Sequence, residues 1–183
     1  MQNDPEILAA TLSPGLGLKA TYRLKKKDGT NTSLDENCPA PIHNDLRKAF
    51  KRLNVHLAVI SEIIPHDEIK NIEKPKHGLL DSFSCTSFEL LDKQTGVKLV
   101  GERKLSTGKH LGLKTPPTKW NDKKHKYAFL SDLTDALEEI KAEIIQYLFH
   151  GKKAPDVQQT LPGMEVDQDG NFTQDFIDEI GEE

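Results

Sequence analysis

The sequence predicts an α+β fold: a small, mostly antiparallel sheet packed against two amphipathic helices, followed by a disordered acidic C-terminal tail. Three observations support this fold class. Two long segments repeat apolar residues at steps of three and four, the spacing of one helix face. Two apolar segments between them are joined by a short loop that contains glycine, as in a β-hairpin. The last 30 residues carry nine acidic residues, no lysine or arginine, and few apolar residues.

These patterns divide the chain into three parts. Residues 1–18 contain a Ser-Pro-Gly-Leu-Gly loop signature and are expected to be flexible. Residues 19–151 are expected to form the α+β domain, and residues 152–183 the acidic tail. A chain of 183 residues suits one domain with an appendage.

A first strand is expected at residues 19–25, where polar and apolar residues alternate. Asp28-Gly29 signals a turn after this strand. The polar residues 30–41 offer no clear partner strand, so a loop is expected there instead.

A helix is expected from Asn44 to Ile64, because its apolar residues follow a 3.6-residue period. Asn44 is the expected N-cap, and Pro65 ends the helix. The outer face carries four cations within two turns: Arg47, Lys48, Lys51 and Arg52. A solvated helix face is the simplest interpretation of these cations.

Two strands are expected at residues 79–91 and 97–104, joined by the glycine-containing loop. Apolar residues change parity within residues 83–91, so this strand either switches faces or contains a bulge. A third short strand is expected at His110–Lys114. A second helix is expected at Ser131–Phe149, ended by glycine and proline.

The composition predicts a cytoplasmic protein without a membrane partner. The sequence has no run of about 18 apolar residues that could form a transmembrane helix, and its polar, acidic N-terminus is unlike a secretory signal. Cys38 and Cys85 are far apart in the chain, which favours reduced thiols over a disulfide.

Common catalytic and metal motifs are missing from the sequence. It contains no CxxC pair, HExxH, Walker phosphate loop or GxSxG elbow. We therefore expect a protein that is not an enzyme, with no cofactor, no metal site and no catalytic residue. One alternative stays open, because a hydrolase with scattered site residues would need only a pocket that unites a histidine with a carboxylate.

Charge is unevenly divided along the chain. All 25 lysine and arginine residues precede the last 30 residues, which leaves a formal charge of +5 on residues 1–153 and −9 on residues 154–183. Basic surfaces attract polyanions, and acidic tails are typical interaction segments.

Basic residues gather between Lys98 and Lys126, with the single tryptophan among them. Lysine and arginine neutralise phosphates, and an aromatic ring can stack on a base. The sequence therefore predicts nucleic-acid binding, with single-stranded DNA as the expected ligand. The predicted contacts are Lys25, Lys26, Lys27, Lys98, Arg103, Lys104, Lys109, Lys114, Lys119, Trp120, Lys123, Lys124 and Lys126. A solvated lysine loop with Trp120 in the core explains the same pattern.

The tail is expected to bind a partner protein or to regulate access to the basic face. Acidic residues alternate with apolar ones near its end, which suits aromatic anchors that enter a pocket while carboxylates contact its edge. The expected partner contacts are Gln158, Leu161, Met164, Phe172, Phe176 and Ile177.

This tail resembles the acidic C-terminal tails of bacterial and phage single-strand DNA-binding proteins, although it does not end in phenylalanine. Gln158 and Leu161 have the spacing of the short peptides that bind the bacterial sliding clamp, where they would fill a polar and an apolar pocket. The resemblance implies a replication protein such as a sliding clamp as one partner.

The rest of the chain resembles small uncharacterised proteins from the replication regions of tailed phages and prophages. The resemblance rests on Asp45–Leu53 and on the hairpin from Phe83 to Pro116, and it covers residues 20–150. It implies a cytoplasmic, non-enzymatic accessory protein of DNA replication or recombination. The alternative is a protein–protein adaptor or inhibitor with no nucleic-acid contact.

Overall fold

The structure has an α+β fold built on a seven-stranded antiparallel sheet. This computed structural model describes residues 5–13, 17–26, 29–72 and 74–154. The strands are β1 (Glu6–Ser13), β2 (Gly17–Lys25), β3 (Asn31–Cys38), β4 (Phe83–Leu90), β5 (Gly96–Lys104), β6 (His110–Lys114) and β7 (Thr118–Lys119). They follow the order β3-β2-β1-β4-β5-β6, and β7 pairs with the first residues of β5.

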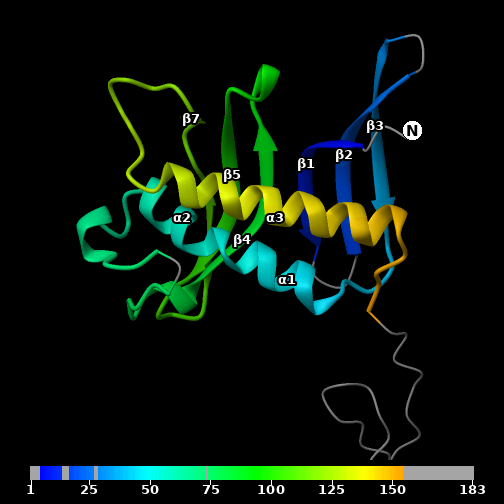
Figure 1. The fold of residues 1–183 in the computed structure, drawn as a ribbon. Helices are drawn as coiled ribbons and strands as arrows, with labels where there is room; N and C mark the ends of the chain where they lie inside the picture. The colour runs from blue at the N-terminus through cyan, green and yellow to red at the C-terminus, as the bar shows by residue number, and fades with distance from the viewer. Residues whose placement is uncertain (1–4, 14–16, 27–28, 73, 155–183) are drawn as a thin grey trace, which may run out of the picture.

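Three α-helices of the described chain lie across one face of the sheet, as Figure 1 shows. They are α1 (Asn44–Lys51), α2 (Leu53–Ile60) and α3 (Leu130–Phe149). Helix α3 contacts α1 and β1, and α2 contacts β4 and β5. Together with the inward side chains of the strands they form one apolar core.

The opposite face of the sheet carries polar side chains and no helix of the described residues. Thr11 of β1 lies opposite Ser87 of β4, and their hydroxyl groups are 2.9 Å apart. Because side chains alternate along a strand, the neighbours of these residues point to the core on the other side. We call this polar side the uncovered face.

The N-terminal segment that the sequence predicts to be flexible contains an interior strand. Residues 6–13 form β1, which pairs with β2 on one side and with β4 on the other. Ile7 and Ala10 of this strand are 1% and 2% exposed. The prediction of a flexible segment over residues 1–18 is therefore wrong for residues 6–13.

The predicted polar loop at residues 30–41 is largely a strand as well. Strand β3 pairs with β2 along its whole length, from Cys38 opposite Leu18 to Asn31 opposite Lys25. Its side chains are polar because it is the edge strand of the sheet, where little of it is buried. Polarity at this position did not exclude strand formation.

The predicted first helix is two helices that meet at Arg52. Helix α1 has one buried face, but α2 buries six of its eight residues and is therefore not amphipathic. The N-cap is His43 instead of Asn44, and its Nδ1 accepts the backbone N–H of Asp45 at 3.2 Å. Helix α2 ends at Ile60, before Pro65.

The remaining predictions of secondary structure agree with the structure within a few residues. The hairpin of β4 and β5, the short strand β6 and the helix α3 all form. The pairing of β4 with β5 is irregular between Cys85 and Ser87, so a bulge explains the change of parity in this strand. Within the described residues, no helix is both long and apolar enough to span a membrane.

Candidate nucleic-acid interface

Three connections far apart in sequence lie at the same end of the sheet, spread across its width. The pairs Lys25–Asn31, Leu90–Val97 and Gly96–Lys119 mark the ends of the strands there. In Figure 1 the β2–β3 hairpin, the β4–β5 turn and the segment between β7 and α3 all rise at the top of the view. We call the seven lysines of these connections the lysine rim: Lys25, Lys26, Lys93, Lys119, Lys123, Lys124 and Lys126.

The cations of the lysine rim form no ion pair with the carboxylates of the described residues. All seven are exposed. Some cations of the helices do pair, Arg52 with Glu139 and Lys141 with Glu138, whereas Arg47 and Lys51 of α1 are as unpaired among the described residues as the rim. The rim therefore presents cations that are free to meet an external anion.

Trp120 joins two of the three connections of the rim. Its indole Nε1 donates to the carbonyl of Gln94 at 2.5 Å, and its backbone N–H donates to the carbonyl of Thr95 at 3.0 Å. The amide of Gln94 donates to Glu6, whose carboxylate also pairs with Arg23 at 3.1 Å. These contacts link β7, the β4–β5 turn, β1 and β2, so the rim is held together by side chains.

The same contacts indicate which role Trp120 has in the rim. Its ring packs partly against the core, and its N–H is already bonded within the protein. The structure therefore supports the interpretation that Trp120 fills a structural position. Stacking of a base on this ring stays a prediction.

Asp122 shapes the loop that carries Lys123, Lys124 and Lys126. Its carboxylate accepts the backbone N–H groups of His125 and Lys124, both at 2.9 Å. These two hydrogen bonds hold the pKa of Asp122 below its usual range. The carboxylate is thus used to form the turn, while the lysine side chains beside it remain exposed.

The other predicted contacts lie away from the rim. Lys98 is the third residue of β5 and Lys114 the last residue of β6; both lie on the uncovered face, and Glu89 of β4 lies opposite Lys98. Lys104 and Lys109 lie at the opposite end of the sheet, at the turn between β5 and β6. The structure therefore divides the predicted set into separate regions.

Arg103 is placed differently again. Its guanidinium lies 5.5 Å from the centre of the Phe83 ring, and its Nε is buried without a hydrogen-bond partner among the described residues. This geometry is that of a cation–π contact inside the protein. Arg103 is thus bound to the body of the fold.

One rim residue was not predicted, and several predicted residues cannot be placed. Lys93 belongs to the β4–β5 turn, where it has a left-handed backbone with φ of 54°. The sequence indicates the turn but gives no sign that it meets the β7 segment. Lys27 and the tail contacts lie outside the described residues; these tail contacts are Gln158, Leu161, Met164, Phe172, Phe176 and Ile177.

A second candidate site is a cavity at the junction of α1 and α2. It has a volume of about 380 Å³ and brings His56 together with two carboxylates, those of Asp81 and Asp132. Nδ1 of His56 lies 2.9 Å from the hydroxyl of Tyr127, and burial lowers the pKa of His56 to about 4. The imidazole is therefore neutral at pH 7.

The hydrolase alternative requires a pocket shared by a histidine and a carboxylate, and the lining of this cavity contains both. A histidine and two carboxylates share its lining, but no contact among the described residues joins the imidazole of His56 to either carboxylate. A general base needs an orienting partner and a nucleophile within hydrogen-bond reach. No group of three or more histidine, cysteine or acidic residues in the described chain could hold a metal ion.

Comparisons with known proteins add no relative to these observations. No family model matches the chain, and searches of curated proteins and of solved structures return no match. The functional argument therefore rests on the geometry of the rim.

Proposed function

We propose that this protein binds nucleic acid through the lysine rim, as a non-enzymatic accessory protein of DNA replication or recombination. The strongest support is that seven exposed lysines from three connections lie along one end of the sheet, and none of them forms an ion pair among the described residues. In this proposal the acidic tail regulates access to the nucleic acid or recruits a partner such as a sliding clamp.

Charge is the expected source of affinity. Each lysine that neutralises a phosphate releases a counterion, so binding should weaken steeply as salt rises. Contacts of Trp120 and Gln94 hold the connections in place, which lowers the entropy that the rim would lose on binding. The rim offers no unbonded indole N–H for reading bases, so little sequence preference is expected.

Two neutralised lysines in the rim test the proposal. Replacing Lys123→Gln and Lys124→Gln in the full chain should weaken binding of a labelled oligonucleotide on the order of tenfold at 0.1 M salt. The slope of log K against log salt should shrink by roughly 1.4 for a single strand, because two phosphate contacts are lost. Fluorescence anisotropy over a salt series measures both quantities.

A matched control removes the same charge from the other end of the sheet. Lys104→Gln with Lys109→Gln should leave the affinity and the salt slope within twofold of the unchanged protein. If both double variants lose the same affinity, the binding is a general effect of net charge and the rim is not the site. If the unchanged protein binds neither DNA nor RNA at low salt, the adaptor or inhibitor alternative is favoured.

A further inference from the structure

A groove opens beside α1, at the end of the sheet opposite the lysine rim. It has a volume of about 280 Å³, and its lining includes Leu12, Ile42 and Phe50 together with the cations Arg47 and Lys51. Both cations are exposed and take part in no ion pair among the described residues. The groove therefore combines an apolar floor with a positive edge.

The sheet itself explains why the groove exists. Strands β1 and β4 pair over only three residues, from Ala9 to Thr11 of β1. Beyond Thr11, β1 continues with β2 alone and β4 with β5 alone, so the two halves of the sheet separate. Helix α1 covers this separation with Phe50, and the groove lies where Leu12 and Ser84 of the two strands no longer pair.

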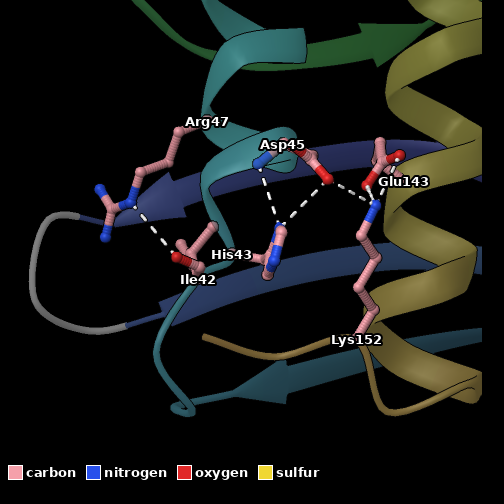
Figure 2. Close-up of polar contacts among 6 residues, drawn as sticks. All are labelled: Ile42, His43, Asp45, Arg47, Glu143 and Lys152. Carbon is pink, nitrogen blue, oxygen red and sulfur yellow. Dashed lines mark hydrogen bonds and ion pairs between the residues drawn. The ribbon is translucent and has the colours of Figure 1, made fainter. Parts of the chain in front are cut away.

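The described chain ends next to this groove. After α3, the backbone N–H of Ala154 donates to the carbonyl of Pro41 at 3.1 Å. The ammonium of Lys152 bonds to Asp45 of α1 at 2.8 Å and to Glu143 of α3 at 2.9 Å, as Figure 2 shows. These contacts fix the start of the tail one residue from Ile42, which lines the groove.

Figure 2 also shows how the edge of the groove is held. The Nε of Arg47 donates to the carbonyl of Ile42 at 3.3 Å, and the guanidinium forms no ion pair with the described residues. The hydrogen bond from Lys152 holds the pKa of Asp45 below its usual range, so this carboxylate stays ionised and bound to Lys152. It does not neutralise Arg47 or Lys51.

We infer that residues 172–180 of the protein's own tail bind in this groove. This segment reads Phe-Thr-Gln-Asp-Phe-Ile-Asp-Glu-Ile and contains three acidic residues and no cation. An apolar side chain such as Phe176 fills the groove, and the neighbouring carboxylates pair with Arg47 and Lys51. The segment is thereby withheld from partner proteins until a tighter binding site competes for it.

The length of the chain before residues 172–180 favours binding of the protein's own tail over binding of a segment from another molecule. Seventeen residues lie between Ala154 and Phe172, and a flexible chain of that length spans about 20–25 Å on average. Binding within one molecule then proceeds at an effective concentration in the millimolar range. The inference is independent of nucleic-acid binding, because the groove and the lysine rim lie at opposite ends of the sheet.

Chymotrypsin cleavage of the full chain tests the inference, since it cuts after Phe172 and Phe176. Arg47→Gln with Lys51→Gln removes two exposed cations from the groove. Cleavage at the two tail sites should become about fivefold faster in this variant, and 0.5 M salt should accelerate cleavage of the unchanged protein. Hydrogen exchange of residues 172–180 should also be faster in the intact double variant than in the intact unchanged protein.

The matched control is Lys123→Gln with Lys124→Gln in the lysine rim, which should leave cleavage unchanged. Equal cleavage rates in all three proteins would overturn the inference, as would acceleration in the rim variant alone. Slower cleavage at higher protein concentration would also overturn it, because the segment would then bind a second copy of the chain. Unchanged thermal unfolding of each variant shows that the fold is intact.

Discussion

His56 is a buried histidine whose polar contact comes from a distant part of the chain. It lies in α2 with 2% of its surface exposed, and its ring contacts the hydroxyl of Tyr127, from a segment 71 residues later. No sequence pattern could have indicated that pairing, because it depends on how the chain before α3 folds back over α2. Because His56 is buried, the stability of the protein should depend on pH in a way that a surface histidine would not produce.

Stability should therefore fall as the pH drops through the range from about 6.5 to about 4. The unfolded chain binds a proton on His56 near pH 6.5, whereas the folded protein resists protonation until about pH 4. Between these two pH values the folded state binds fewer protons than the unfolded state, so the free energy of unfolding falls by on the order of 3 kcal/mol. Urea unfolding at pH 7.5 and pH 4.5 measures the difference.

In His56→Gln the difference in the free energy of unfolding between pH 7.5 and pH 4.5 should be smaller by about 2 kcal/mol. Equal dependence in the unchanged protein and His56→Gln would show that the imidazole is not buried in its neutral form.

At the scale of elements, α3 and the central hairpin were predictable, whereas the break between α1 and α2 at Arg52 and the strands β1 and β3 were not. Periodicity and the glycine-containing loop identify α3, β4 and β5, since these have one strongly apolar face. Strand β1 is irregular between Ile7 and Ala9, so its apolar residues do not alternate. Strand β3 is polar because it is an edge strand, and local composition does not reveal sheet position.

Gly101 shows how closely three of these elements approach one another. A Cβ placed on this residue of β5 would lie 2.2 Å from the carbonyl oxygen of Ser84 and 2.7 Å from a methyl group of Leu57. Gly101→Ala should therefore destabilise the protein by about 1–3 kcal/mol, because backbone atoms must move. Chemical denaturation measures the change.

Gly112→Ala in the neighbouring strand β6 is the control for that substitution. Its added methyl group meets no atom within 4 Å, so the free energy of unfolding should change by less than about 0.5 kcal/mol. A loss of equal size in both variants would mean that the effect comes from the strand backbone and not from the contact with Leu57 and Ser84.

At the scale of the molecule, the sequence predicted the charge division but not its arrangement. Counting residues shows a basic body and an acidic tail. It does not show that Lys25 and Lys119 lie at the same end of the sheet, or that the described chain ends at the other. That arrangement requires the antiparallel register of the whole sheet, which no local pattern specifies.

Removal of the tail should therefore affect nucleic-acid binding through long-range charge alone. In a chain ending at Ala154, affinity for an oligonucleotide should rise severalfold at 0.01 M salt, where the screening length is about 30 Å. At 0.15 M salt this length is about 8 Å, and the gain should largely disappear. Anisotropy titrations at both salt concentrations measure it.

A gain that persists at 0.15 M salt would contradict this arrangement. It would mean that the tail lies directly over the lysine rim and competes with phosphates there. In that case, tail removal would raise the oligonucleotide affinity of the double variant Lys123→Gln with Lys124→Gln less than that of the unchanged protein.

The order of the elements has a consequence for how the protein is made. Strands β1 to β3 complete their meander by Cys38, but the edge-to-face contact of Tyr22 with Phe149 and the bond from Tyr147 to Ala40 come from the last helix. A ribosome adds about 5–20 residues per second. On the order of 5–20 s therefore pass between the synthesis of the meander and the synthesis of helix α3, which covers it. During translation these early strands would be the natural substrate for a chaperone.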